Sequence, residues 1–410
     1  MTSPTFQNKG TKYMFGWPEY NLEAHVSRIH LNHERAVCHL LFTSSHEESN
    51  PHILQTRFNL ESARARSELA KEMASRYKIK DTPIDWKNLL EYLSAKILQE
   101  YERGEPVIEI SSDDDVGPLE YLIEPIAPLN KPTVIFGDPG SGKSQLAIIL
   151  SILVILPWAD NPLRLVPPKE PTISLFCDYE ADGDDIRRQL KGFVVGMGLG
   201  FVPLYYRRCT FPVVDDIEAI RNHMEAINAK CLFIDSTSLA AGGDLNRMDV
   251  ATSYFRSLRQ LNVTTISLSH TSKDRESKSK TILGSVLFEA GARSVWECRG
   301  QEDEDTLDLA MFHRKANLSK KSKPLGYRIT YSDSGNMITW HDPRSVAEFV
   351  ERMGTNQRIF ELLKEGYLST EEITKALDIS QANCRVALKR LKDKGLAIKA
   401  GDQWGLLHKE

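Results

Sequence analysis

Short runs of consecutive apolar residues alternate with amphipathic stretches through the middle of the chain. The apolar runs are bounded by polar turns and cover residues 132–136, 172–179, 230–235 and 264–269. Between them, residues 184–193, 214–229 and 248–261 have the apolar spacing of helices. Strands that are apolar throughout are buried on both faces, and an intervening helix makes consecutive strands parallel. The pattern predicts an α/β fold with a mainly parallel sheet covered by helices on both faces.

The region before this block has a different pattern. Residues 26–32 and 36–43 alternate like the two strands of a hairpin around a polar turn. Residues 59–77 and 85–103 have the spacing of amphipathic helices. Because this small α+β region contains no chemical motif, we expect it to serve docking or oligomerisation. The run of Ser and Asp at residues 111–115 is typical of a solvated linker.

The region after the block contains three short helical patterns and then two short strand patterns. Ser369 and Glu372 have the spacing of a capping box, and Ser380 stands where a further helix should begin. The expected helices cover residues 356–363, 369–377 and 380–394, and the strands lie within residues 396–407. We therefore expect three domains, at residues 1–110, 117–340 and 354–410.

Composition narrows the class of protein. The 410 residues are 41% hydrophobic and 26% charged with a formal net charge of −4, so nucleic acid could bind only through local basic patches. Six scattered cysteines without a C-x-x-C pair predict buried thiols in a reducing compartment and no zinc site. The longest apolar run, residues 146–156, is shorter than the roughly 18 residues of a membrane span. With no signal peptide pattern at the N-terminus, we expect a cytoplasmic protein without a membrane partner.

The most informative motif is the octapeptide at residues 137–144, which matches the P-loop pattern G-x-x-x-x-G-K-[ST] at every fixed position. A strand pattern precedes it and an apolar helix pattern follows, as the motif requires. Backbone N–H groups of such a loop surround a phosphate chain, and the helix N-terminus adds its positive end. We expect Lys143 to bind the β- and γ-phosphates of ATP and Ser144 to ligate Mg²⁺. The expected nucleotide-binding residues are Gly137, Asp138, Pro139, Gly140, Ser141, Gly142, Lys143 and Ser144.

Three further strand patterns end in polar residues that suit hydrolysis. Asp235 closes an apolar run in the Walker B form, in which the carboxylate holds Mg²⁺. Glu180 closes another run and could polarise a water molecule, with Asp178 as the weaker candidate for that role. His270 closes a third run and could sense the γ-phosphate. Each has a simpler alternative, because Glu180 could be a loop residue facing solvent and His270 could be structural.

The order of these motifs resembles that of RecA-superfamily ATPases, and more narrowly of plasmid RepA-type hexameric helicases. The resemblance covers about residues 120–340 and extends to residues 239–244, 284–285, 292–296 and 315–317. It implies Glu180 as the general base, Asp235 as the Walker B carboxylate and His270 as the sensor. It also implies that Arg293 is an arginine finger entering a neighbouring subunit's site, which requires a ring, expected to be a hexamer. A surface salt bridge is the alternative for Arg293, and which of His313, Arg314 and Lys315 faces the nucleotide stays open.

Two segments are candidates for DNA contact. In RecA-like rings, the loop after the His270 strand faces the channel, and here it contains Lys273, Arg275, Lys278 and Lys280, which could follow a single-stranded phosphate backbone. A merely solvated loop is the alternative, because acidic residues dilute its charge. Residues 380–396 resemble the recognition helix of a winged-helix domain, in which Val386, Leu388 and Leu391 would pack inward. Its outward cations would then contact duplex DNA, unless the module docks a protein instead; they are Arg385, Lys389, Arg390 and Lys392.

These expectations combine into a Mg²⁺-dependent ATPase that moves along DNA. The resemblance implies a ring-shaped, replicative-type DNA helicase of a plasmid, phage or other mobile element. The alternative is an ATP-switched DNA-binding regulator or recombination mediator that does not unwind DNA. A signalling ATPase without a DNA role is the third hypothesis.

Overall fold

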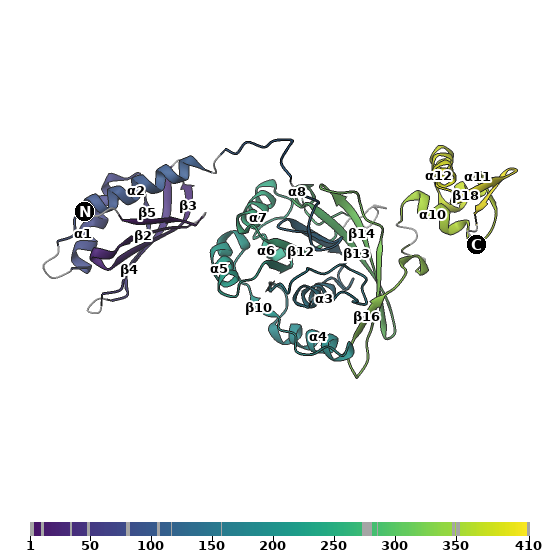
Figure 1. Ribbon diagram of the computed structural model, residues 1–410, viewed down its shortest axis with the longest axis horizontal. Coiled ribbons are helices and arrows are strands. Elements are labelled where there is room, and N and C mark those ends of the chain that lie inside the picture. Colours follow the sequence, from purple (N-terminus) through teal and green to yellow (C-terminus); the bar gives the residue numbers. More distant parts are fainter. Residues whose placement is uncertain are drawn as a thin grey trace. The chain divides into compact units, whose positions relative to one another are not determined.

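The computed structural model describes residues 4–9, 12–32, 35–46, 50–78, 83–104, 107–115, 117–156, 158–272, 281–284, 286–346, 349 and 353–407. The chain divides into two compact units, residues 1–117 and 118–410 (Figure 1). The first unit has one buried cluster of apolar side chains, whereas the second contains several separate ones.

The first unit is a five-stranded antiparallel sheet with two helices packed on it (Figure 1). The residues of strand β4 alternate between a buried face and a more exposed face. This alternation is typical of a sheet that packs on helices with one face only. The predicted hairpin corresponds to β3 and β4, and the two predicted helices are both present. The elements are β1 (Thr5–Asn8), β2 (Tyr13–Trp17), β3 (Leu22–Asn32), β4 (Arg35–Ser44), β5 (His52–Asn59), α1 (Ala63–Arg76) and α2 (Trp86–Arg103), with a 3₁₀ turn η1 (Pro18–Tyr20).

The second unit contains a nine-stranded sheet in the order β10-β9-β11-β12-β8-β13-β14-β15-β16. The first six strands of this order are mutually parallel, and the last three continue it in antiparallel pairing. The fold is therefore the predicted α/β class with a mainly parallel sheet. The strands are β8 (Pro132–Gly137), β9 (Ser174–Asp178), β10 (Tyr205–Arg208), β11 (Cys231–Asp235), β12 (Thr264–His270), β13 (Ser294–Asp303), β14 (Thr306–Ala316), β15 (Leu325–Thr330) and β16 (Met337–Trp340).

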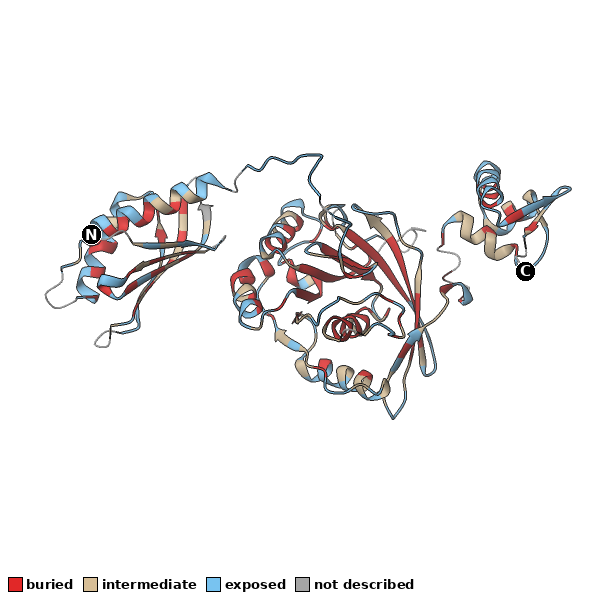
Figure 2. Ribbon diagram, in the orientation of Figure 1, coloured by how far each residue is buried: buried red, intermediate tan, exposed pale blue. Residues whose placement is uncertain are grey.

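Helices cover both faces of this sheet, as the sequence pattern predicts. Helices α3 (Lys143–Ile155) and α4 (Gly183–Gly196) pack on one face, within the cluster that contains Trp296. The other face is covered by α5 (Val213–Ala226), α6 (Thr237–Ala240), α7 (Met248–Leu261) and α8 (Val286–Gly291). Figure 2 shows α3 buried around its whole circumference, which explains why its sequence is apolar on every side. A small pair of strands, β6 (Tyr121–Ile123) and β7 (Ala127–Pro128), precedes the sheet.

The C-terminal residues form a small helical module with its own core and a three-stranded sheet, β17-β19-β18. The predicted capping box is present, with the Ser369 side chain accepting from the Glu372 backbone and the Glu372 side chain accepting from the Ser369 backbone. The elements are α10 (Thr355–Leu362), β17 (Leu368–Ser369), α11 (Thr370–Leu377), α12 (Gln381–Asp393), β18 (Ala397–Ala400) and β19 (Gln403–Leu406), preceded by a 3₁₀ turn η2 (Pro343–Ser345). Within the described residues, none of the helices has both the length and the apolar character needed to cross a membrane.

Candidate nucleotide-binding site

The P-loop joins the end of β8 to the start of α3, at the edge of the sheet where the parallel strands end. Gly142 has φ +77°, and a Cβ atom there would lie 2.6 Å from Leu309 Cδ2. A Cβ atom on Gly137 would lie 2.2 Å from the carbonyl oxygen of Cys298. These contacting atoms belong to β13 and β14, so this hairpin packs against the P-loop. It leaves no room for a side chain at either glycine.

Lys143 folds back over the loop that precedes it. Its Nζ donates to the carbonyl oxygens of Gly137 at 3.0 Å and Asp138 at 2.7 Å, and the residue is 7% exposed. Burial lowers the pKa of this ammonium group, while the carboxylates of Asp235, Asp138 and Glu180 favour the charged form. The cation therefore lies inside the loop whose backbone would surround a phosphate chain.

Asp235 ends the strand between β9 and β12 and is 7% exposed. Burial raises the pKa of its carboxyl group to about 6, and the nearby carboxylates of Glu180 and Asp178 add to this shift, whereas a hydrogen bond with Ser144 opposes it. A buried carboxylate paired with a hydroxyl is an oxygen donor set that suits Mg²⁺. A divalent cation there would favour the charged form of Asp235 and offset the repulsion from the neighbouring carboxylates. The residues present fit the magnesium site that the sequence predicts.

Glu180 and His270 come together from neighbouring parts of the sheet edge. Glu180 Oε1 lies 3.2 Å from His270 Nε2 and also accepts a hydrogen bond from Ser236 Oγ. The hydrogen bond from His270 is the main reason that the pKa of Glu180 is lowered, and the Ser236 hydroxyl and the Lys143 charge act in the same direction. Glu180 is therefore held as a carboxylate, the form that can accept a proton from water.

Asp178, the weaker candidate base, has a different surrounding. It is 1% exposed and accepts the backbone N–H groups of Glu180 and Ala181, each at 2.9 Å. The Tyr206 hydroxyl donates to its second oxygen at 3.2 Å. These bonds hold the turn that presents Glu180, which favours Glu180 as the residue available to water.

Several residues that the sequence patterns do not single out complete this edge. The Thr271 hydroxyl donates to Asp138 Oδ1, and the Thr237 hydroxyl donates to Ser269 Oγ at 2.8 Å. The Tyr331 hydroxyl donates to the Gln145 side chain at 2.8 Å, beside the start of α3. Tyr331 follows β15, in the antiparallel extension of the sheet. Its approach to the P-loop depends on long-range strand pairing, so no local sequence signal could have identified it.

Arg293 does not lie near the P-loop of its own chain. Its backbone N–H donates to Pro132 O at 2.8 Å, at the start of β8, whereas the P-loop follows the end of that strand. The separation along the strand is about 17 Å at the usual rise per residue. Among the described residues, no hydrogen bond or ion pair engages the Arg293 guanidinium, so the salt bridge considered as its alternative does not occur there.

His313, Arg314 and Lys315, between which the sequence does not decide, lie near the end of β14 and all have internal partners. His313 stacks on Trp296 with ring centroids 4.1 Å apart, and burial lowers the pKa of its imidazole to about 4. Arg314 Nε donates to Glu297 at 2.6 Å. Lys315 Nζ donates to backbone carbonyl oxygens at the end of α8. None of the three faces the P-loop of its own chain.

The loop candidates for DNA contact, Lys273, Arg275, Lys278 and Lys280, lie outside the described residues. The ends of their loop are described and are joined by two backbone hydrogen bonds. Ser272 N donates to Thr281 O at 2.9 Å, and Leu283 N donates to His270 O at 2.8 Å. The loop base is thus tied directly to His270.

Helix α12 presents its four predicted cations, Arg385, Lys389, Arg390 and Lys392, on its exposed face. Leu388 and Leu391 are buried as expected, but Val386 is 50% exposed, so the prediction that it packs inward is wrong. Residues two apart on a helix point about 200° apart, so Val386 cannot share the face of Leu388. Cys384 and Ala387 take the inner positions instead.

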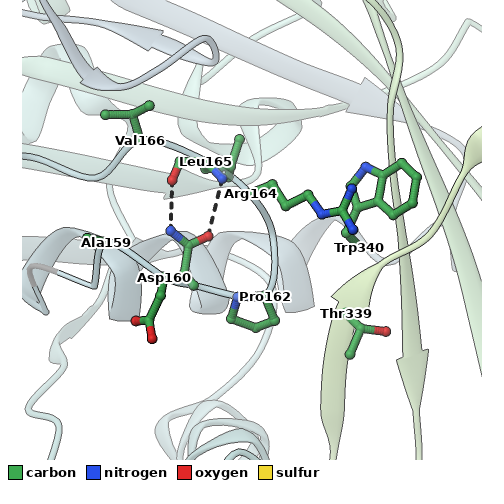
Figure 3. A pocket seen from close by; sticks show the side chains of 9 residues that line it. Ala159, Asp160, Pro162, Arg164, Leu165, Val166, Thr339 and Trp340 are labelled. Carbon is green, nitrogen blue, oxygen red and sulfur yellow. Dashed lines mark hydrogen bonds between the residues drawn. The ribbon is translucent and has the colours of Figure 1, made fainter.

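A hollow of about 650 Å³ lies beyond the C-terminal end of α3 (Figure 3). Its loop is held by Asn161, whose side chain bonds the backbone of Trp158 and Leu165. The Arg164 guanidinium lies over the Trp340 ring, 4.0 Å from the ring centre. α3 is about 20 Å long, so this hollow is separate from the P-loop.

Comparisons with known proteins found two family models and a solved structure that resemble parts of the chain. Residues 102–276 match a family model described as an AAA domain, and residues 355–397 match one described as winged helix-turn-helix DNA-binding. A KaiC-like protein from the archaeon Pyrococcus horikoshii is similar, with 21% identity over 55% of this chain and 100% of that chain at a TM-score of 0.38. No curated protein shows significant similarity to the chain.

The fold, the P-loop and the first family model define an α/β protein with an AAA-type ATPase domain. The second family model adds a C-terminal winged helix-turn-helix domain of the DNA-binding type. The chain therefore combines a region that matches an AAA domain with a region that matches a winged helix-turn-helix of the DNA-binding type.

Proposed function

We propose that this protein is an ATP-hydrolysing motor that acts on DNA. The observation that carries the proposal is the convergence of Lys143, Asp235 and the hydrogen-bonded Glu180–His270 pair at one edge of the sheet. Phosphate binding, metal binding and activation of water each require one of these groups. The loop proposed to contact DNA begins directly after His270, and its base is hydrogen-bonded to the His270 backbone. A change at the nucleotide that moves His270 would therefore also move this loop.

In this proposal each group has a distinct task. The backbone of residues 137–142 and the Lys143 ammonium bind the β- and γ-phosphates, and Ser144 with Asp235 holds Mg²⁺. When bound, Mg²⁺ neutralises charge that develops on the transferred phosphoryl group. Glu180 accepts a proton from the attacking water, and His270 orients Glu180 and responds to the γ-phosphate.

ATPases with an arginine finger use a further cation, besides Mg²⁺ and the P-loop lysine, to stabilise the transition state, and Arg293 lies too far away to supply it within one chain. We propose that Arg293 enters the site of a neighbouring copy. Such a contact joins different surfaces of the two copies, and when repeated it gives a ring if the rotation between copies closes; we propose that it closes here as a hexamer. Hydrolysis would then depend on assembly, as it does for arginine fingers supplied in trans.

For the finer function, we propose a replicative-type DNA helicase of a mobile element, with single-stranded DNA in the channel and residues 271–281 contacting it. The winged helix would contact duplex DNA through α12. Following the expected domains, residues 1–110 would dock a partner or support assembly. This role draws on the resemblance of the motif order to plasmid RepA-type helicases.

A strand-displacement assay on forked DNA tests the helicase role. The wild-type protein should unwind the fork with ATP and Mg²⁺, and Lys143→Ala should abolish both unwinding and hydrolysis. Glu180→Gln should still bind ATP but hydrolyse it about 10²–10⁴-fold more slowly. An exposed substitution, Lys191→Ala in α4, serves as the control and should leave both activities unchanged.

The second candidate is an ATP-switched DNA-binding regulator or recombination mediator. The exposed cations of α12 favour it, since a recognition helix reads duplex rather than single-stranded DNA. It predicts ATP turnover with sequence-specific duplex binding and no strand displacement. That result would reject the helicase in favour of the switch.

A further inference from the structure

Lys315 makes an unusual set of contacts at the end of β14. Its Nζ donates to the carbonyl oxygens of Glu289 at 2.6 Å, Ala290 at 2.9 Å and Ala292 at 2.9 Å. These carbonyls end helix α8 and the turn that follows it. The last carbonyls of a helix lack intrahelical partners and carry partial negative charge, so a cation there stabilises the helix end.

These contacts use the whole hydrogen-bonding capacity of the side chain. A lysine ammonium has three N–H donors, and three carbonyl oxygens accept from Lys315. Partial burial lowers its pKa, and Glu289 favours its charged form. A group engaged in this way has no donor left for a phosphate, whether of its own chain or of a neighbour.

The turn whose carbonyl oxygens accept from Lys315 leads directly into Arg293. The Arg293 backbone donates to Pro132 O at 2.8 Å and accepts from Asn317 N at 3.1 Å. Lys315 holds the preceding carbonyl, that of Ala292, so the backbone on both sides of the Arg293 Cα atom is fixed. The guanidinium itself has no hydrogen bond or ion pair within the described part of the chain. A side chain with a fixed backbone and no partner among the described residues is suited to a group outside its own chain.

We propose that Lys315 is a positioning residue that fixes the turn between α8 and β13 from which Arg293 reaches the neighbouring copy. The inference rests on the proposed role of Arg293 in trans. Lys315 acts on hydrolysis through Arg293 and does not touch the nucleotide. Its effect therefore belongs to the transition state of the neighbouring site and not to ATP binding.

A double-mutant cycle on the full-length protein separates positioning from direct contact. Lys315→Met removes every donor, and Arg293→Ala removes the guanidinium. Lys315→Met should lower kcat for ATP about 10²-fold, as expected when a catalytic group is displaced by about 1 Å, with KM changed less than about twofold. In the Arg293→Ala background, adding Lys315→Met should lower kcat no further.

Further variants keep the test informative if Lys315→Met folds poorly. Lys315→Gln retains two donors and should lose less activity than Lys315→Met, and Lys315→Arg should recover most of it. Lys320→Met, an exposed lysine on the following turn, is the matched control and should behave as wild type. Thermal unfolding and the size of the assembly, measured on each variant, exclude loss of folded or assembled protein as the cause.

Three results would overturn the proposal. If Lys315→Met lowers kcat by the same factor with and without Arg293, Lys315 acts on the nucleotide independently. If Lys315→Met leaves kcat unchanged while Arg293→Ala lowers it, Arg293 works in trans without needing the hydrogen bonds from Lys315. If Arg293→Ala itself has no effect on kcat, the role in trans fails, and the positioning role fails with it.

Discussion

The Nε2 atom of His270 lies 3.2 Å from Oε1 of Glu180, joining the ends of two strands that are 90 residues apart in the chain. β11 lies between these strands, and Ser236, which follows it, also donates to Glu180. The pair connects the residue proposed to activate water with the base of the loop proposed to contact DNA. Any change that alters this bond should affect the charge state of Glu180 and the position of that loop together.

The first prediction concerns the pH dependence of hydrolysis. The hydrogen bond from His270 lowers the pKa of Glu180, so the carboxylate persists as pH falls and is lost only below its ordinary value of 4.5. His270→Ala should raise this pKa and move the acidic limb of the kcat profile to higher pH. Steady-state hydrolysis between about pH 3 and 8 measures it, with His223→Ala on the exposed side of α5 as control. An acidic limb that stays in place would show that His270 does not set the charge of Glu180.

The second prediction concerns Asp235 and the stability of the nucleotide-free protein. Because burial raises its pKa from 3.8 to about 6, the folded state binds a proton that the unfolded state releases between these values. The free energy of unfolding should therefore fall as pH rises through this window, by about 3 kcal/mol from this one group. Asp235→Asn should remove that pH dependence, stabilise the metal-free protein at pH 7 and abolish Mg²⁺-dependent hydrolysis.

Urea unfolding at about pH 4.5 and pH 7, with and without Mg²⁺, measures the effect of Asp235. Mg²⁺ should stabilise the wild-type protein more at neutral than at acidic pH, because it competes with the proton for the carboxylate. Asp160→Asn, an exposed aspartate, is the control and should leave the pH dependence unchanged. If Asp235→Asn and the wild-type protein are equally stable at neutral pH without Mg²⁺, the buried Asp235 charge does not destabilise the folded state, and the prediction is wrong.

The third prediction separates backbone strain from steric contact in the P-loop. Gly142 and Gly198 both have positive φ, +77° and +64°, but only Gly142 has an atom within 4 Å of a built Cβ. Gly198→Ala should cost about 1–2 kcal/mol of stability from the left-handed backbone alone. Gly142→Ala should cost about 1–3 kcal/mol more, because its methyl group meets Leu309, and it should weaken ATP binding. Equal destabilisation in the two variants, measured by urea unfolding, would show that the β14 contact does not constrain the loop.

The fourth prediction concerns the exposed cations of α12. Replacing Lys389 or Arg390 with Gln should weaken duplex DNA binding, and the slope of log K against log salt should become shallower by about 0.9 for each phosphate that the variant no longer neutralises. Lys375→Gln, an exposed lysine at the end of α11, is the control within the same module. Fluorescence anisotropy at several salt concentrations measures both quantities. An unchanged slope for every α12 variant would favour a protein-docking role for the module.

Much of the fold and the centre of the site could be predicted because the responsible signals are local. Strands that are apolar throughout, such as β8 and β11, must be buried on both faces, so their pattern indicates parallel pairing wherever they lie in the sheet. The P-loop could be identified because eight consecutive residues determine its geometry. Asp235 and Glu180 could be placed at one edge because the carboxyl ends of parallel strands meet there.

The antiparallel extension of the sheet and the partners of single side chains could not be predicted in this way. The prediction places Val386 on the buried face of α12 because it is apolar like Leu388 and Leu391. In a helix, however, Val386 and Leu388 point to nearly opposite sides. Asp178 and Glu180 are difficult to distinguish because both lie at the end of one strand. Only the backbone N–H groups that fold back onto Asp178 separate their roles.

By itself, the sequence determined that the protein has a triphosphate-binding motif at the end of a buried strand and a cationic helix near its C-terminus. The tertiary structure alone decided that Lys315 is committed to the end of α8 and that Arg293 lies at the far end of β8 from its own P-loop. The physical reason is that a local sequence pattern reflects only whether neighbouring residues are buried together, and not which distant strand they pair with. The pairing of β13 with β8, which places Arg293, depends on contacts between residues more than a hundred positions apart.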